Sequence, residues 1–367
     1  MSSRVIIGDC RAVLPTLEAG SVQTCVTSPP YWGLRDYGHA GQIGLESTPA
    51  EYVAEMVTVF REVRRVLRDD GTLWLNLGDS YASSGGATPG KRSEGIGQAE
   101  VGEGLRRPTR KGSGRADGIV TGESPRNRDG APPCDLPAKN LVGIPWRVAF
   151  ALQADGWYLR QDIIWAKPNP MPESVRDRCT KSHEYLFLLA KSERYYFDQD
   201  AILEPVAAAS VARLSQPTLG EQEGSDRVPG KTNGNMKAVS RSGNKERKPA
   251  RARGVPVDTN GETNGAVAGS VPWEGSERNK RSVWTVTTQP FKGAHFATFP
   301  PALIEPCILA GSKPGDIVLD PFGGSGTTGQ VSEALGRKWL LIELNGEYAN
   351  LCADRTRQTG MELACGS

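Results

Sequence analysis

The residues Ser28-Pro29-Pro30-Tyr31 combine groups suited to holding a weak amine nucleophile. Two successive prolines fix φ at both positions and remove two backbone N–H donors, so the turn is rigid and directs its carbonyl oxygens outward. The Ser28 hydroxyl and the Pro29 carbonyl are two acceptors for the two N–H bonds of an amine whose lone pair is delocalised into a ring. Tyr31 adds an aromatic face on which that ring could stack. We therefore predict group transfer to an exocyclic amine, with much of the rate coming from positioning.

A second stretch, Asp320-Pro-Phe-Gly-Gly-Ser-Gly-Thr-Thr-Gly329, has the composition of a ligand-binding turn. It follows a short apolar strand pattern at 316–319 and precedes a helical pattern at 330–335. Glycines let the backbone approach a ligand closely, and the helix N-terminus offers unpaired N–H groups. A further strand pattern at 338–342 ends in Glu343, a carboxylate that could take the two ribose hydroxyls of a nucleoside. The whole pattern predicts a site for a nucleoside cofactor.

The glycine spacing narrows the choice of cofactor. A dinucleotide fingerprint places G-x-G-x-x-G directly after the strand, whereas Asp320-Pro-Phe322 intervenes here. A phosphate-binding P-loop ends in Gly-Lys-Ser/Thr, and no Lys follows these glycines. Neither a dinucleotide nor a P-loop nucleotide is therefore indicated.

The segment Asp320-Pro-Phe-x-Gly-x-Gly326 resembles the S-adenosylmethionine loop of the amino-methylating DNA methyltransferases. The segment Ser28-Pro-Pro-Tyr-Trp32 resembles their catalytic motif, in which Asp, Asn or Ser precedes Pro-Pro and an aromatic residue. The catalytic motif comes first and the cofactor loop last, which resembles the circularly permuted, β-type order of this N4-cytosine and N6-adenine methyltransferase family. The resemblance covers the chain apart from two inserts.

The resemblance implies roles for individual residues. The implied cofactor is S-adenosylmethionine, with Phe322 against it, Gly324 and Gly326 leaving room for its methionine part, Asp320 beside its methionine amine, Glu343 at its ribose and Asp9 at its adenine amino group. The segment 297–303 resembles the helix that covers the methionine end of the cofactor. The implied substrate is double-stranded DNA, whose target base is flipped out of the duplex.

Residues beyond the two motifs could contact the target base. Trp165 offers a stacking face and Lys167 a charge within Trp165-Ala-Lys-Pro-Asn169. Trp32 is either a wall of the base pocket or part of the core. Asp79 also ends a predicted strand beside the site, and we favour a structural role for it over a catalytic one.

The residue at the head of the tetrapeptide favours cytosine N4 as the target. In this family Ser at that position usually accompanies cytosine, and Asp usually accompanies adenine. Adenine N6 is the first alternative, because its N1 lies where cytosine presents N3. A protein glutamine methyltransferase is a more distant alternative, which typically begins its motif with Asn and needs no basic inserts. A catalytically inactive DNA-binding module is disfavoured by the intact Ser28, Asp320, Phe322 and Glu343.

Strands and helices must alternate to position these residues. Apolar or β-branched runs predict strands at 5–7, 22–27, 72–77, 158–166, 184–190, 316–319 and 338–342, with 194–197 paired to or continuing the fifth. Helical spacing of apolar residues predicts helices at 10–17, 50–67, 144–154, 301–310 and 330–335. This order predicts an α/β fold with a doubly wound, mostly parallel, seven-stranded Rossmann-like sheet. Ligands bind outside the carboxyl ends of such strands, so the residues expected to converge on one edge are Asp9, Ser28, Asp79, Asp320 and Glu343.

Charge divides the 367-residue chain into a framework and two basic inserts. Residues 88–140 hold ten Lys and Arg against seven Asp and Glu, and residues 205–281 hold thirteen against eight, whereas the whole chain has a net charge of only +2. We predict a discontinuous methyltransferase domain at 1–87, 134–204 and 282–359, a flexible basic insert at 88–133 and a tail at 360–367. The insert at 205–281 lies where the family places its target-recognition region.

The remaining composition excludes several classes of protein and site. The seven cysteines lack C-x-x-C spacing, and with only three histidines we expect neither a disulfide framework nor a metal site. No apolar run approaches the ~18 residues of a membrane span, and the first residues lack the apolar core of a signal peptide. We expect a cytoplasmic protein that acts on DNA without a membrane partner. A cognate restriction endonuclease and a homodimer are further partners consistent with the resemblance.

Overall fold

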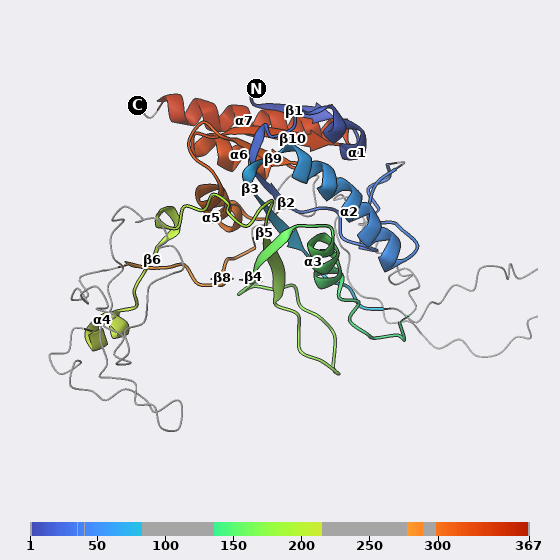
Figure 1. Ribbon diagram of the computed structural model, residues 1–367. Helices are drawn as coiled ribbons and strands as arrows, with labels where there is room; N and C mark the ends of the chain where they lie inside the picture. Colours follow the sequence, from blue (N-terminus) through green and yellow to red (C-terminus); the bar gives the residue numbers. More distant parts are fainter. Residues whose placement is uncertain are drawn as a thin grey trace, which may run out of the picture.

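The computed structural model describes residues 2–34, 36–39, 41–82, 136–214, 277–288 and 299–365 (Figure 1). The predicted insert at 88–133 and most of that at 205–281 lie outside these described residues. Residues 297 and 298, the start of the segment expected to cover the methionine end, also lie outside them. The domain boundaries therefore stay predictions.

Eight strands form the main sheet, one more than the sequence predicts: β1 Arg4–Ile7, β2 Val22–Thr27, β3 Leu67–Leu77, β4 Tyr158–Ala166, β5 His183–Ala190, β8 Val283–Thr285, β9 Ile317–Asp320 and β10 Lys338–Glu343. Their order across the sheet is β1-β10-β9-β2-β3-β5-β4-β8. Neighbours from β1 to β3 are parallel, and β5 runs antiparallel to both β3 and β4. The additional strand, β8, pairs in parallel with β4 and has only three residues, too few to show a period in the sequence.

Helices cover both faces of the sheet (Figure 1). One layer contains α1 Cys10–Val13, the 3-10 turn η1 Leu14–Thr16, α2 Pro49–Val66 and α3 Ile144–Ala154. The other contains α5 Pro301–Gly311, α6 Thr327–Ala334 and α7 Gly346–Cys365. The α2 helix shows how the sequence specifies such an element, because a capping box between Thr48 and Glu51 starts it and its apolar face is buried. Separate apolar clusters lie under the two layers, as a doubly wound sheet requires.

Three segments differ from the sequence-based expectation. The β3 strand begins at Leu67, directly after α2, rather than at residue 72. Residues 194–197 form no strand; among them the Phe197 ring stacks on Trp74 and meets Tyr195 edge-on. A C-terminal helix, α7, runs from Gly346 to Cys365 and follows the last element that the sequence predicts.

Two short strands join the ends of the second insert. The β6 strand, Glu204–Pro205, pairs antiparallel with β7, Glu277–Arg278. Glu204 also forms ion pairs with Arg278 at 3.0 Å and with Arg281 at 3.1 Å. The short helix α4, Ala208–Leu214, follows β6. The chain therefore leaves and re-enters the framework at one place.

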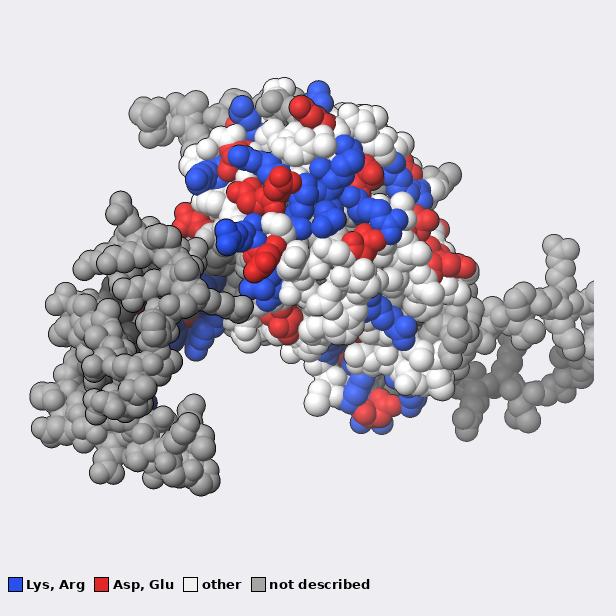
Figure 2. Space-filling view, in the orientation of Figure 1, with Lys and Arg blue, Asp and Glu red and all other residues white. Residues whose placement is uncertain are grey.

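The surface charge on the face shown in Figure 2 is mixed. Lys and Arg gather in the upper part of this face, with Asp and Glu between them. Ion pairs among the described residues include Arg65 with Glu62 at 2.7 Å and Arg68 with Asp316 at 3.3 Å. Interleaved charges of both signs do not form the continuous cationic track that phosphates favour. Within the described ranges, no helix combines the length and the apolarity needed to cross a membrane.

Candidate active site

A cavity of about 880 Å³ lies at the carboxyl ends of the parallel strands. The predicted site residues on its wall are Asp9, Ser28, Pro29, Pro30, Tyr31, Trp165, Lys167, Asp320, Phe322, Gly324 and Glu343. Those that follow or end β1, β10, β9 and β2 meet because the ends of these strands are neighbours across the sheet. Trp165 and Lys167 come from the end of β4 and the residues after it. The volume lies in the range of small-molecule and cofactor sites.

The turn after β2 holds the Tyr31 ring in one place. The Tyr31 hydroxyl donates to the Glu184 carboxylate at 2.8 Å, and its oxygen also lies 3.1 Å from the Asn76 amide oxygen. A Cβ on Gly78 would lie only 2.4 Å from the ring, so glycine at this position admits the ring. Burial is the main reason that the pKa of the Tyr31 hydroxyl is raised well above its ordinary value. The ring is therefore a neutral phenol, fixed at its edge and at its hydroxyl.

A second anchor holds the two prolines. Tyr52, on the buried face of α2, donates its hydroxyl to the Pro30 carbonyl at 2.9 Å. No described residue donates a hydrogen bond to the Pro29 carbonyl, and the Ser28 hydroxyl makes a long contact of 3.4 Å with Tyr31. The Ser28 hydroxyl and the Pro29 carbonyl, which the sequence predicts to accept hydrogen bonds from an amine, are thus left available by the fold.

A charged pair, Lys167 with Glu184, extends this network along the cavity wall. The two side chains are only 18% and 16% exposed, so solvent screens the pair weakly. Lys167 also lies over the Trp165 ring, 4.2 Å from its centroid, and the Trp165 indole donates to the Val286 carbonyl at 2.8 Å. Glu184 was not predicted as a site residue, and its one signal in the sequence is a carboxylate at the start of an apolar strand. Asn76 was also not predicted, and nothing in the local pattern of β3 marks it.

Asp320, the last residue of β9, orders the glycine turn from within. One carboxylate oxygen accepts from the Thr27 hydroxyl at 2.6 Å and from the Phe322 N–H at 3.0 Å, and the other accepts from the Thr328 hydroxyl at 2.7 Å. The residue is 1% exposed. Burial raises the pKa of the Asp320 carboxyl to about 6, although the three hydrogen bonds act in the opposite direction.

Glu343, the last residue of β10, holds the same turn from the other side. Its two carboxylate oxygens accept the N–H of Gly324 at 2.7 Å and the N–H of Asn345 at 2.9 Å. A Cβ on Gly323 would lie 3.1 Å from the Leu341 Cβ, so the turn packs closely on β10. Burial raises the pKa of the Glu343 carboxyl. Each carboxylate oxygen keeps a further lone pair for a ligand hydroxyl.

Two other carboxylates at strand ends, Asp9 and Asp79, cap helices. Asp9 follows β1 and accepts the Arg11 N–H at 2.8 Å at the start of α1. Asp79 accepts the N–H of Gly143 at 2.9 Å and of Ile144 at 3.0 Å at the start of α3. Asp79 also lines the cavity, so the structural role that we favour for it from the sequence stays a prediction.

Trp32 and Gly326 do not line the cavity, and of the two places that the sequence allows for Trp32 the structure gives the core. Trp32 is 1% exposed in the core, where its indole donates to the Glu46 carbonyl at 2.9 Å. Gly326 caps α6 with a φ of 80°, and a Cβ there would lie 2.8 Å from the Cys352 Cα. This glycine therefore leaves room for α7, and its role beside the cofactor stays a prediction. Neither partner could be identified from the spacing of the motifs.

Comparison with known protein families decides among the classes that such a cavity could serve. A sequence profile of the N6 and N4 methyltransferases, described as DNA methylase, matches residues 22–354. The chain belongs to this family. The Type II methyltransferase M.Cfr9I of Citrobacter freundii is 43% identical over 348 residues, which are 95% of this chain and 85% of that protein. The Type II methyltransferase M.SmaI of Serratia marcescens is 41% identical over 354 residues, covering 96% and 90%.

Solved structures confirm the fold of this DNA methylase. The PvuII DNA methyltransferase, whose title calls it cytosine-N4-specific, superposes with a TM-score of 0.55 at 18% identity, covering 97% of this chain and 86% of that one. A putative DNA modification methylase from Thermus thermophilus, solved with S-adenosyl-L-methionine, gives a TM-score of 0.50 at 20% identity, covering 97% and 94%. The mostly parallel methyltransferase sheet expected from the sequence is therefore confirmed.

The cofactor of the DNA methylase is S-adenosylmethionine, and the cavity wall fits such a molecule. Carboxylates at the ends of β9 and β10 flank a turn in which Gly323 packs against the strand, and Phe322 adds an aromatic side chain. Among the described residues, no group of three or more His, Cys, Asp or Glu is placed to hold a metal ion. The assignments of Asp320 to the methionine amine, Glu343 to the ribose and Asp9 to the adenine stay predictions.

Proposed function

We propose that this methyltransferase modifies the N4 amine of cytosine at a specific site in double-stranded DNA. The observation that carries the proposal is the pair of acceptors at Ser28 and Pro29, which the fold leaves available while Tyr52 and Glu184 hold the rest of the turn. A hydroxyl can accept from an amine N–H or donate to a ring nitrogen, whereas a carboxylate can only accept. Cytosine presents N3 beside its amine, which suits a neutral hydroxyl at the head of the turn.

The residues of the turn account for the activation of such an amine. S-adenosylmethionine supplies an electrophilic methyl group when it is bound. The Ser28 hydroxyl and the Pro29 carbonyl accept the two N–H bonds and draw the nitrogen towards sp³ geometry, which returns its lone pair from the ring. The fixed Tyr31 ring stacks on the flipped base and sets the direction of approach. These residues position the amine and accept its hydrogen bonds, and the nitrogen that gains the methyl group gives up one of its two protons to solvent.

Adenine N6 is the second candidate, because adenine N1 lies in the place of cytosine N3 and the Ser28 hydroxyl does not exclude it. Methylation of a protein glutamine is less favoured, because the relatives at 41–43% identity are named Type II methyltransferases over nearly the whole chain. The same names support a further part of the proposal, that this chain protects DNA from a restriction endonuclease with the same recognition site.

Mass spectrometry of nucleosides tests the target base. The chain is expressed in a host without DNA methylation, and the host with an empty plasmid is the control. We expect mass spectrometry to detect N4-methylcytosine. Single-molecule sequencing of the same DNA should place it in one sequence context. N6-methyladenine without N4-methylcytosine would overturn the cytosine assignment and leave the enzyme class in place.

A further inference from the structure

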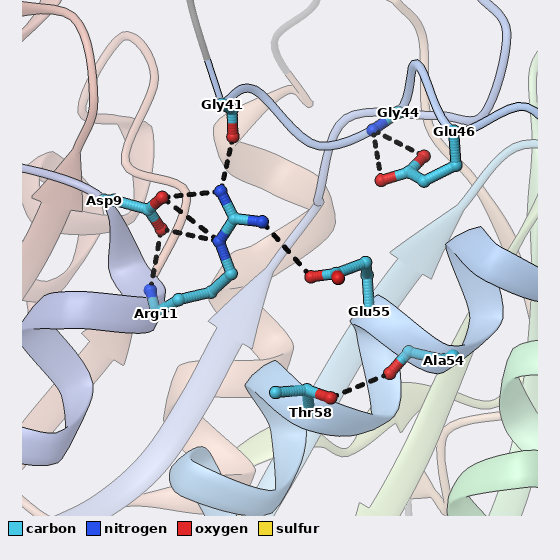
Figure 3. Close-up of polar contacts among 8 residues, drawn as sticks. All are labelled: Asp9, Arg11, Gly41, Gly44, Glu46, Ala54, Glu55 and Thr58. Atoms are coloured by element: carbon cyan, nitrogen blue, oxygen red, sulfur yellow. Dashed lines mark hydrogen bonds and ion pairs between the residues drawn. The ribbon is translucent and has the colours of Figure 1, made fainter.

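The Arg11 guanidinium joins three segments beside the cavity (Figure 3). Its Nη2 donates to the Asp9 carboxylate and to the Gly41 carbonyl, both at 2.6 Å. Its Nε lies 3.0 and 3.1 Å from the two Asp9 oxygens, and its Nη1 donates to Glu55 at 3.2 Å. The strand end at β1, the loop at 41–47 and helix α2 therefore share one cation.

Two of these three partners belong to the cavity wall. Asp9 and Gly41 both lie on it, and so do Gln42 and Ile43 of the same loop. Glu55 is not on the wall, and it holds the guanidinium from the α2 side. Arg11 therefore contacts Asp9 and the loop at Gly41 on the cavity wall, and it contacts Glu55 on the side away from the cavity.

The pair of Arg11 and Asp9 differs from an ordinary surface ion pair. Its side chains are 33% and 31% exposed, and the guanidinium meets both carboxylate oxygens. A planar guanidinium fork fixes the orientation of a carboxylate as well as its charge, which an ammonium does not. The hydrogen bonds from Arg11 lower the pKa of Asp9, so this carboxylate stays ionised. An oriented, ionised carboxylate at the cavity can accept a hydrogen bond from a ligand amine.

We propose that Arg11 is a positioning residue for S-adenosylmethionine: it orients the Asp9 carboxylate and fixes the loop at Gly41 as a wall of the cofactor site. The inference rests on the cofactor and on Asp9 facing its adenine amine, and it is independent of the target base. Arg11 itself makes its contacts with the protein, so its effect on the cofactor passes through Asp9 and the loop.

The test compares cofactor binding with catalysis in the full-length chain. Arg11→Met keeps much of the side-chain length and removes every donor. Calorimetry with S-adenosylmethionine should show affinity weakened at least about tenfold, whereas the single-turnover methylation rate at saturating cofactor should change less than about threefold. Arg11→Lys keeps the positive charge but lacks the planar guanidinium, so its affinity for S-adenosylmethionine should lie between those of the wild type and Arg11→Met.

The matched control is Arg61→Met, which removes the ion pair with Asp155 between α2 and the end of α3, away from the cavity wall. Its cofactor affinity should equal that of the wild type. Unchanged affinity in a folded Arg11→Met protein would overturn the proposal. Parallel losses of melting temperature, affinity and saturated rate would also overturn it, because they indicate a structural role only. Failure of the wild-type chain to bind S-adenosylmethionine would instead contradict the cofactor assignment.

Discussion

The Tyr31 hydroxyl donates a 2.8 Å hydrogen bond to the Glu184 carboxylate, across 153 positions of the chain. Tyr31 follows the parallel strand β2, whereas Glu184 lies near the start of the antiparallel strand β5. The ring also lies against Gly78, which directly follows β3. Three strands therefore fix one aromatic ring, and in the proposed function that ring sets the pose of the target base.

Gly78→Ala should slow methylation without weakening cofactor binding. The added Cβ would lie 2.4 Å from the Tyr31 ring, so the ring must leave its place. We expect the single-turnover rate to fall at least about tenfold, roughly 1.4 kcal/mol in the barrier, with unchanged calorimetric affinity for S-adenosylmethionine. Gly346→Ala is the control, because nothing lies within 4 Å of its added Cβ. A wild-type rate in Gly78→Ala would show that catalysis does not depend on the position of the ring.

Tyr52→Phe should loosen the proline turn. The change keeps the buried ring and removes the hydroxyl that donates to the Pro30 carbonyl at 2.9 Å. We expect a loss of about 1 kcal/mol in the free energy of unfolding, measured by denaturant titration, and a lower methylation rate at saturating cofactor. Tyr196→Phe serves as the control, because its hydroxyl makes only a 3.4 Å contact with Asp198 and is not on the cavity wall. Equal rates in the two variants would argue against an anchoring role.

The sequence predicts the meeting of Asp9, Ser28, Asp320 and Glu343 because each follows a strand of a parallel sheet. The carboxyl ends of such strands share one edge, so knowledge of the strands suffices to place these residues together. The type and order of most of the framework elements were likewise predictable, since helical and strand periods are local properties of the chain. These parts of the site need no information about distant contacts.

The partners of Tyr31 and Pro30 could not be predicted in this way. Glu184 and Tyr52 act through contacts between elements that are far apart in sequence, and no spacing rule relates them to the tetrapeptide. Trp32 shows the same limit, because an aromatic residue after a motif can face the cavity or the core. Only the packing of α2 and the antiparallel strands decides these cases.

The burial of Asp320 predicts a pH dependence of cofactor binding. Burial raises the pKa of its carboxyl from 3.8 to about 6, so ionisation requires a higher pH than for a free aspartate. The ionised form should pair with the cationic methionine amine, and cofactor affinity should therefore increase as the pH rises through about 6. The stability of the protein without cofactor changes in the opposite direction. Because the pKa of Asp320 is higher in the folded state than in the unfolded state, the free energy of unfolding falls as the pH rises from 3.8 to about 6.

Asp320→Asn tests this pH dependence by keeping the size of the side chain and removing its titration. We expect affinity about tenfold lower at neutral pH, with a flatter dependence on pH in calorimetry. Glu343, whose pKa is also raised by burial, leaves a residual slope in both proteins. The difference between the pH slopes of cofactor affinity in the wild type and in Asp320→Asn therefore gives the contribution of Asp320. Identical slopes would contradict the assignment of Asp320 to the methionine amine.

The insert at 205–281 should supply DNA affinity and site choice. Its thirteen Lys and Arg against eight Asp and Glu favour phosphate contacts, which make binding depend steeply on salt. Because β6 and β7 bring the ends of the insert together, a short Gly-Ser linker can replace residues 215–276 without separating the framework strands. This variant should keep its affinity for S-adenosylmethionine, lose most of its affinity for DNA and lose its preference for one site, since base contacts specify sequence.

Replacing Arg247, Lys248, Arg251 and Arg253 by Gln should only flatten the salt dependence of DNA binding and leave the methylated site unchanged. Methylation of the same site by the linker variant would place the recognition surface elsewhere in the chain.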